Sequence, residues 1–288
     1  MVTTTSIIMM IINLIIAVLI PVILAIVLKR KYHTSMKVFF IGCAVWFVFA
    51  MILEQLMHAA ILLSPAGKTI QGNIWLYGLY GGLAAGVFEE TGRFLSMKLL
   101  MKKNYDNSYN SLMYGAGHGG FEALYLLGVG MINNLTYAFL INTDQTELLL
   151  ATVPAEQQET VRQTFQTLIE TKSYTFLLGA FERFPAVLLH ISLSVLVWIA
   201  VTKGKHALFP LAIFLHFFVD AATVVINGYG VPAVLLEMIV LVMAVLVALL
   251  SYTIWKQNGM PDAPEAGHEP VEEDRISGED TELDIDSH

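Results

Sequence analysis

The stretch TSIIMMIINLIIAVLIPVILAIVL, Thr5–Leu28, contains 24 residues and no charged side chain. A helix of roughly 20 mostly apolar residues is long enough to cross the hydrocarbon core of a bilayer. No basic leader precedes this stretch, no small-residue cleavage site follows it, and its apolar run is longer than that of a secretory signal. It therefore predicts a retained membrane-spanning helix.

Six further stretches are long and apolar enough, or nearly so, to span a membrane. They are about Lys37–Leu63, Asn73–Phe88, Asn110–Ile141, Phe176–Thr202, Ala207–Ile226 and Pro232–Trp255. The third span, which ends at Phe88, is short. The fourth is long and rich in glycine, which allows a kink or a re-entrant segment. We predict an all-α polytopic membrane helix bundle of about seven transmembrane helices over residues 1–256.

The composition excludes several other classes of protein. Of the 288 residues, 16 are basic and 24 acidic, so 14% are charged, whereas 56% are hydrophobic. Soluble domains carry about 25% charged residues. This deficit argues against a soluble enzyme, a nucleic-acid-binding protein and a disordered chain. Cys43 is the single cysteine, so no intrachain disulfide framework or multi-cysteine cofactor site is expected.

The acidity of the chain is concentrated at its end. Residues 257–288 hold 11 of the 24 acidic residues and a single Arg. This composition predicts an acidic, disordered cytoplasmic tail. Such a charge run usually only solvates a protein, and the alternative is a docking arm for a partner.

Basic residues in the loops indicate the orientation of the bundle. One set of loops and span ends holds Lys29, Arg30, Lys31, Lys37, Lys98, Lys102, Lys103, Lys203, Lys205 and Lys256, and the opposite set holds only Lys68, Arg162 and Lys172. The N-terminus is therefore expected outside, and the tail in the cytoplasm, of a multi-pass plasma-membrane protein. The connection Asn142–Tyr174 then lies outside, with a helix expected from Glu156 to Thr171.

Function is sought among the ionisable residues of the spans, because a charge in hydrocarbon costs several kcal/mol unless it is paired or faces the bundle interior. The first cluster is Phe88-Glu89-Glu90-Thr91-Gly92-Arg93. Arg93 is within helical reach of either glutamate. The two carboxylates point about 100° apart on a helix, so one can be held by Arg93 while the other is free to act. The alternative is an ordinary ion pair at an exposed helix end.

Two further clusters each place a His and a carboxylate four residues apart on one helix face. They are Gly115-Ala116-Gly117-His118-Gly119-Gly120-Phe121-Glu122 and His216-Phe217-Phe218-Val219-Asp220. The glycines permit either an unwound segment or close helix packing. In the predicted topology, the three clusters converge in the cytoplasmic half of the bundle.

The remaining intramembrane ionisable residues are assigned to packing of the bundle rather than to chemistry. They are Glu54, His58, Glu182, Arg183, His190 and Glu237. Glu54 and His58 are four apart, and Glu182 and Arg183 are expected to neutralise each other. His190 has no partner near it in sequence.

Together the three clusters resemble the YhfC-type intramembrane protease family, which is similar to the CAAX prenyl proteases and the bacteriocin-processing membrane proteases. The shared order is a glutamate pair with a following Arg, a His, and a later His followed by Asn or Asp, over roughly Gly81 to Ile226. The resemblance implies a bacterial intramembrane endopeptidase that cleaves a membrane-associated protein or peptide with glutamate-activated water.

The resemblance also implies roles for the residues of the clusters. Glu89 is the expected general base, and His118 positions its water. His216, with Asp220, stabilises or protonates the tetrahedral intermediate. The remaining two roles fall to Arg93, which anchors Glu90, and to Glu122, which orients His118.

The sequence departs from the wider pattern in two places. Arg93 follows the second glutamate by three residues instead of four, and Asp220 replaces the usual Asn. An ionised Asp cannot donate a hydrogen bond to an oxyanion. Asp220 is therefore expected either to be protonated or to orient His216.

Two alternatives remain open. No cofactor is the first expectation, and the alternative is zinc held by His118, His216 and Glu89, although the chain has no His-Glu-x-x-His motif. The alternative function is a proton-coupled transporter that uses the buried Glu/His network. The absence of an internal repeat argues against a transporter. Expected partners are a membrane protein or peptide substrate and the bilayer, without nucleic acid.

Overall fold

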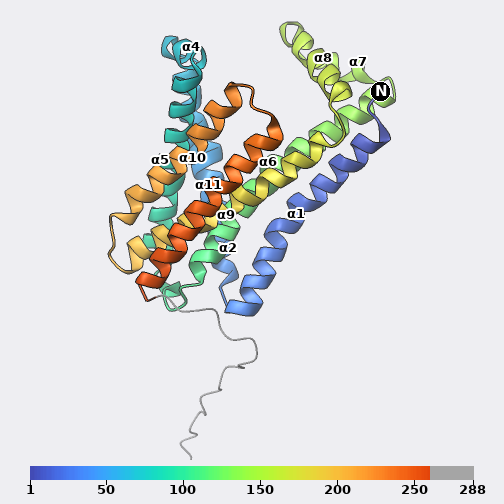
Figure 1. Ribbon diagram of the computed structural model, residues 1–288. Coiled ribbons are helices and arrows are strands. Elements are labelled where there is room, and N and C mark those ends of the chain that lie inside the picture. The colour runs from blue at the N-terminus through green and yellow to red at the C-terminus, as the bar shows by residue number, and fades with distance from the viewer. Residues whose placement is uncertain (260–288) are drawn as a thin grey trace, which may run out of the picture.

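A computed structural model describes residues 1–259, and all regular elements in this part of the chain are helices (Figure 1). The long helices are α1 (Thr4–Tyr32), α2 (Met36–Trp46), α5 (Ile74–Leu100), α6 (Asn110–Asn142), α8 (Ala155–Glu170), α9 (Thr175–Thr202), α10 (Leu208–Gly228) and α11 (Ala233–Gln257). The short elements are the π-helix η1 (Phe47–Glu54), α3 (Gln55–Leu62), α4 (Pro65–Gln71), η2 (Lys102–Asn104) and α7 (Thr146–Leu150). The predicted acidic tail lies outside the described residues from position 260 onward.

Six of the seven predicted spans are helices long and apolar enough to cross a membrane. They are Thr4–Tyr32, Met36–Leu62, Asn110–Asn142, Thr175–Thr202, Leu208–Gly228 and Ala233–Gln257. Large apolar side chains of α1, such as Ile15, Ile23 and Ile26, are exposed on the outside of the bundle. Such a surface fits lipid rather than water. The chain is therefore a polytopic, all-α membrane protein.

The remaining predicted span, the third along the chain, corresponds to α5. This helix is long enough to cross a membrane but is less apolar than the other six. It has 27 residues. The prediction that it ends at Phe88 is wrong, because Glu89, Glu90 and Arg93 are buried and paired inside the bundle instead of marking an exposed end. The helix therefore continues to Leu100. Whether α5 counts as a seventh crossing stays a prediction, as does the orientation of the termini.

The glycine-rich helix α6 is continuous over Asn110–Asn142, so the re-entrant segment that the glycines allowed is absent from it. A Cβ at Gly117 would meet the carbonyl oxygen of Phe39 on α2, far inside contact distance, and one at Gly115 would lie 2.5 Å from the Ile191 Cα on α9. These glycines let neighbouring backbones approach closely, as small residues do between membrane helices. Close approach fixes α6 between α2 and α9.

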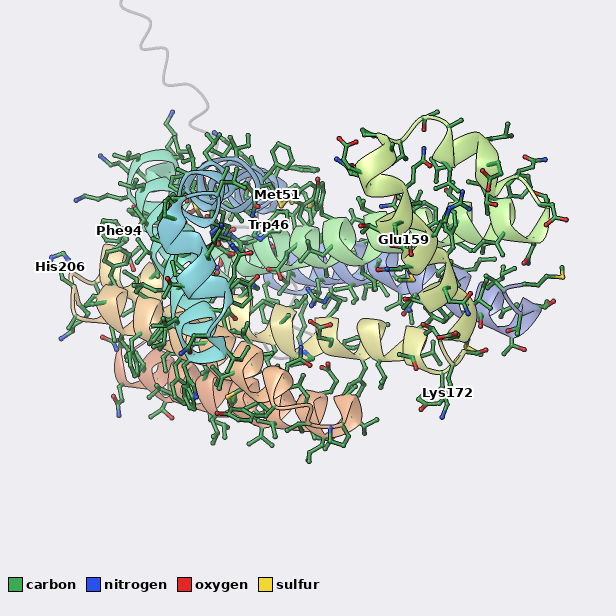
Figure 2. All side chains as sticks on the ribbon, turned by 90° about the horizontal axis from the view of Figure 1, so that it is seen from above. Trp46, Met51, Phe94, Glu159, Lys172 and His206 are labelled. Atoms are coloured by element: carbon green, nitrogen blue, oxygen red, sulfur yellow. The ribbon has the colours of Figure 1, made fainter. Side chains whose placement is uncertain are left out.

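The remaining packing brings four helices around one centre. Helix α5 packs along α10, α6 packs against α1, α2 and α9, and α9 also packs against α11. The helix predicted from Glu156 to Thr171 is confirmed as α8. In the view from above, α8 with Glu159 lies on one side of the molecule, away from Phe94 and His206 (Figure 2). Because α9 also packs against α1, α5 and α10, it is the central helix of the bundle, and α5, α6 and α10 lie around it.

Candidate functional site

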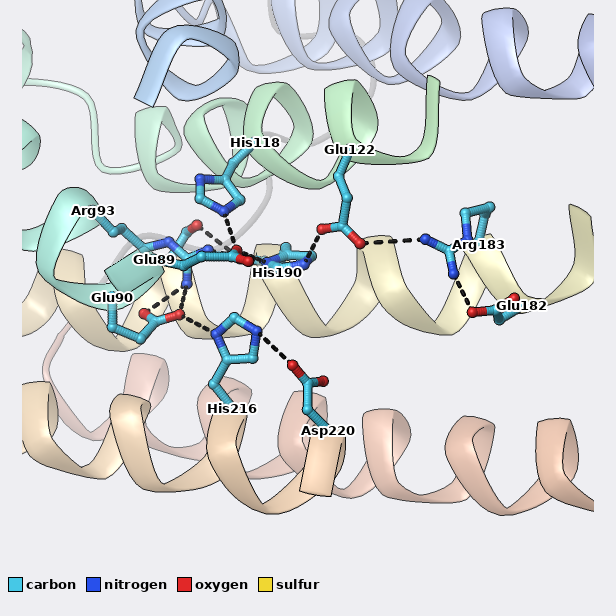
Figure 3. A network of polar contacts seen from close by, with 11 residues as sticks. Glu89, Glu90, Arg93, His118, Glu122, Glu182, Arg183, His190, His216 and Asp220 are labelled. Atoms are coloured by element: carbon cyan, nitrogen blue, oxygen red, sulfur yellow. Dashed lines mark hydrogen bonds and ion pairs between the residues drawn. The ribbon is translucent and has the colours of Figure 1, made fainter. Parts of the chain in front are cut away.

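The three predicted clusters meet between α5, α6, α9 and α10. All seven predicted site residues take part: Glu89, Glu90, Arg93, His118, Glu122, His216 and Asp220 (Figure 3). Glu90, Arg93 and His118 have no exposed surface. The convergence of the clusters predicted from sequence is thus confirmed, whereas its cytoplasmic sidedness stays a prediction.

Arg93 holds the second glutamate of the pair. Its Nη1 donates to Glu90 Oε1 at 2.6 Å and to Glu90 Oε2 at 2.7 Å, while its Nη2 lies 3.1 Å from His190 Nδ1. The two glutamates are consecutive on α5, so their side chains point in different directions. Glu90 is therefore fixed by Arg93, and Glu89 points elsewhere.

Glu89 lies against two histidines. Its Oε2 is 2.8 Å from His118 Nε2 and 3.9 Å from His190 Nδ1. The rings of His118 and His190 are 4.9 Å apart. One ligand atom from each of Glu89, His118 and His190 lies within 4.8 Å of the other two, and all three residues are buried. This is a His₂-carboxylate donor set of the kind that binds zinc.

His190 is held in one tautomer by its neighbours. The Arg93 guanidinium can only donate, so Nδ1 of His190 must accept and the ring proton sits on Nε2. Nε2 lies 2.5 Å from Glu122 Oε2. A carboxylate behind a histidine in this way is the arrangement that orients metal-binding imidazoles. The lone pair of His190 Nδ1 thus accepts from Arg93 Nη2, and the same nitrogen lies 3.9 Å from Glu89 Oε2.

The sequence suggested that Glu122 orients His118, but the structure places Glu122 elsewhere. It contacts His190 and accepts from Arg183 Nη1 at 3.3 Å. His118 instead faces Glu89 from the neighbouring helix. The predicted pairing of Glu182 with Arg183 is present, and Arg183 bridges Glu182 and Glu122. The i,i+4 spacing of His118 and Glu122 was a correct pointer to one region but not to a contact.

His216 lies between two carboxylates. Its Nδ1 is 2.9 Å from Glu90 Oε1 and its Nε2 is 3.4 Å from Asp220 Oδ2. Its ring is 5.2 Å from the ring of His190. The structure groups His190, rather than His216, with Glu89 and His118, and the alternative zinc set with His216 stays a prediction. With both ring nitrogens facing carboxylates, His216 is placed to hold a proton.

The charges of the network suit a cation. The ten residues labelled in Figure 3 include five carboxylates and two guanidinium groups. Buried charge without compensation is costly, so the excess of acid requires protonated histidine or a bound cation. The donor set and this charge imbalance both fit a divalent metal ion at Glu89, His118 and His190.

A cavity of about 410 Å³ opens beside this centre between α9, α10 and α11. Glu89, His190, His216 and Asp220 line one part of it, and Glu237 lines it from α11. Ligand pockets in proteins commonly enclose about 300–1,000 Å³. The space is therefore sufficient for part of a peptide to reach the buried polar groups.

The remaining sequence-predicted pair, Glu54 and His58, makes no hydrogen bond or ion pair with this centre within the described part of the chain, although the Glu54 carboxylate is close enough to interact electrostatically with His216 and Asp220. Glu54 Oε1 is 3.1 Å from His58 Nε2, and His58 Nδ1 is 2.7 Å from the Tyr80 hydroxyl. Glu54 ends the π-helix η1, an irregular element often found near functional sites. The helical pairing of Glu54 and His58 is confirmed.

Sequence reasoning missed His190 as a site residue. No charged residue lies within four positions of His190 in the sequence, and the surrounding part of its helix is mostly apolar. The available signal was a lone His in the interior of the predicted span Phe176–Thr202. Its partners Arg93 and Glu122 come from two other helices and are visible only in three dimensions.

Comparison with known proteins agrees with this geometry. The family model described as YhfC intramembrane metalloprotease matches residues 16–253. The chain is 40% identical over 232 residues to the uncharacterized membrane protein YhfC of Bacillus subtilis (strain 168), covering 79% of this chain and 87% of that protein. No solved structure matches. The matched region contains all the helices of the site, and the chain belongs to the YhfC intramembrane metalloprotease family.

Proposed function

We propose that this protein is a metal-dependent intramembrane endopeptidase that hydrolyses a peptide bond of a membrane-associated protein or peptide. The observation that carries the proposal is the buried donor set of Glu89, His118 and His190, whose ligand atoms lie within 4.8 Å of one another. The family description supports a metalloprotease over the metal-free alternative. Both point to zinc rather than to the absence of a cofactor.

Three residues of the chain would bind the metal, and a fourth would orient one of them. His118 and His190 offer ring nitrogens and Glu89 offers a carboxylate oxygen, and Glu122 favours the His190 tautomer in which Nδ1 carries no proton. This nitrogen accepts from Arg93 Nη2, and that hydrogen bond would have to open for Nδ1 to bind the metal. When bound, zinc supplies Lewis-acid activation of water and of the peptide carbonyl. The acidic surroundings stabilise a dication at this point.

We also propose that Glu89 accepts a proton from the attacking water. It lines the cavity, so a water molecule that attacks the scissile carbonyl carbon can pass a proton to its carboxylate. The oxygen of that water forms the new C–O bond, and the carbonyl π electrons move onto the carbonyl oxygen. The C–N bond breaks when the leaving nitrogen receives a proton.

His216 is the proposed donor of that proton and a stabiliser of the oxyanion. It lines the same cavity, and it lies between Glu90 and Asp220, which favour its protonated form. Asp220 thus acts by orienting His216 and does not need to donate to the oxyanion. Arg93 is a positioning residue, since it fixes Glu90 behind His216 and contacts His190.

Metal binding is tested on the purified full-length protein in lipid nanodiscs by elemental analysis. Wild type is expected to retain close to one zinc per chain, and His118→Ala and His190→Ala less than a tenth of that. His216→Gln is the matched control, since it removes a buried histidine of the same network and is expected to keep the metal. Loss of zinc in His216→Gln with retention in His190→Ala would favour the alternative set of His118, His216 and Glu89.

Peptidase activity is tested in cells by comparing new protein N-termini in strains that express wild type or a variant. Cleavage that depends on the protein is expected to disappear in Glu89→Gln, His118→Ala and His216→Ala. Cleavage that survives all three changes contradicts the proposal. If Glu89 binds the metal, Glu89→Gln is expected to lower the zinc content together with the activity. Activity lost with the metal retained would leave Glu89 the role of proton acceptor and remove it from the ligand set.

A further inference from the structure

Glu237 is a buried carboxylate in the wall of the cavity, away from the proposed catalytic group. It is 8% exposed, and its Oε2 has no hydrogen-bond partner among the described residues. The other acidic side chains that line the cavity each have a basic partner: Glu89 with His118, Glu122 and Glu182 with Arg183, and Asp220 with His216. Glu122 Oε2 also lacks a hydrogen bond, but it lies 2.5 Å from His190 Nε2. Among the described residues, Glu237 is therefore the carboxylate of the lining without a basic partner.

Nothing in the packing of α11 requires an acid at this position. The helix is strongly apolar, with a mean hydropathy of 3.0 in its most apolar window. An unpaired carboxylate inside a membrane protein is costly, and such groups commonly mark a substrate or ion pathway. The nearby guanidinium of Arg183 is already shared between Glu122 and Glu182. We therefore expect the partner of Glu237 to be a ligand that enters the cavity.

Glu237 and the proposed catalytic group line the same cavity, and the length of this cavity can be estimated along α9. Its lining on α9 runs from Glu182 to His190. These residues are eight apart, which is about 12 Å of helix rise. An extended peptide advances about 3.3 Å per residue, so about four residues fit along this length. Five acidic side chains and one Arg line the cavity, so its field attracts cations.

We propose that Glu237 binds a cationic side chain, Lys or Arg, of the peptide substrate within about four residues of the cleaved bond. This inference rests on the proposed peptidase function for its substrate, but the cation site itself is defined by Glu237 and the cavity. It makes Glu237 a specificity-determining residue and not a catalytic one.

Binding is tested with n-pentylguanidinium as the probe and n-pentylurea as its uncharged counterpart, on the full-length protein in lipid nanodiscs. Wild type is expected to bind the cation and not the urea, as measured by calorimetry. Glu237→Gln is expected to weaken binding of the cation by about tenfold or more, because one partner of a buried charge pair is lost. Glu237→Met is a second neutral variant, suited to an apolar helix should the Gln variant fail to fold.

Glu156→Gln is the matched control, since Glu156 is an exposed acid on α8, outside the cavity. It is expected to bind the probe as wild type does. Equal affinity of wild type and both Glu237 variants for n-pentylguanidinium overturns the proposal, whether or not a cleaved protein is found.

Cleavage sites in cells give the second readout. Sites produced by wild type are expected to have Lys or Arg within four residues, and Glu237→Lys is expected to shift this preference toward Asp and Glu. A wild-type preference that is unchanged in Glu237→Lys also overturns the proposal. If no cleavage occurs while the probe binds through Glu237, the peptidase function fails and the cation site stands.

Discussion

Arg93 shows how much of the site depends on single buried charges. Its side chain and that of Glu90 are fully buried, and they are 2.6 Å apart. Both charges are also linked to histidines, Glu90 to His216 and Arg93 to His190. Removing either charge leaves the other without compensation in a place where water cannot replace it. The pair therefore supports both the fold and the placement of two site histidines.

We expect Arg93→Met to destabilise the protein by about 3–5 kcal/mol, because it leaves the Glu90 carboxylate buried and unpaired. The matched control is Arg162→Met. Arg162 pairs with Glu147 at 3.0 Å, but both side chains are largely exposed, so the loss is expected to be about 0–1 kcal/mol. Unfolding of the purified proteins in detergent, followed by circular dichroism, measures both. Equal effects of the two changes would contradict a structural role for the buried pair.

The sequence was a good guide to residues whose partners lie nearby in the chain, and a poor one to the rest. Glu90 and Arg93, or His216 and Asp220, are one helical turn apart and were predicted to interact. His190 was assigned to packing, because its contacts Arg93 and Glu122 come from α5 and α6. Helical spacing carries information over about four residues, whereas the donor set joins three helices. That set could only be found once the helices were placed.

At the scale of elements, α6 is held in place by its glycines. Gly115 faces α9, Gly117 faces α2 and Gly120 faces Pro21 of α1, each without room for a side chain. His118 lies within this run, so its distance from Glu89 depends on how closely α6 approaches its neighbours. The composition of the run fitted both an unwound segment and a tight helix contact. The sequence did not identify the facing backbones, and those decide between the two.

We expect Gly117→Ala to destabilise the protein by about 1–3 kcal/mol and to lower its zinc content, since the added methyl group forces α6 away from α2. Gly130→Ala is the control on the same helix, because nothing lies within 4 Å of a Cβ there. It is expected to be neutral or to stabilise slightly, by less than about 1 kcal/mol, through helix propensity. Thermal unfolding and elemental analysis measure the two effects. A harmless Gly117→Ala would contradict the role of close packing.

The boundaries of most spans could be predicted from the sequence, but the end of α5 could not. The apolar helices begin and end within a few residues of the predicted positions, because hydrophobicity falls where the chain leaves the bilayer. In α5 the fall at Glu89 marks an internal polar site, and the helix continues to Leu100. Hydropathy alone cannot distinguish a charge that faces solvent from one that faces a partner helix. The same ambiguity applies to Glu237 in α11.

For the whole molecule, the position of the site along the helices links the chemistry to the orientation in the membrane. His118 is eight residues from the start of α6, His216 eight from the start of α10, and His190 twelve from the end of α9. These ends face the basic loops around Lys103 and Lys203. The site is therefore nearer to the basic end of the bundle, and the cavity extends from it toward the connection between α10 and α11 at residues 229–232.

The positive-inside rule places the basic end in the cytoplasm and α8 outside. We expect alkaline phosphatase fused after Gln157 to be active and the same enzyme fused after Lys203 to be inactive, because this reporter works only outside the cytoplasm. Fusions to green fluorescent protein at the two positions should give the opposite result. A reversed pattern in both reporters would contradict the predicted topology. With the expected pattern, the catalytic group lies in the cytoplasmic half, and the end of the cavity at the α10–α11 connection faces outward. A substrate bound at Glu237 then extends from the outer half of the membrane to a cleavage point in the inner half.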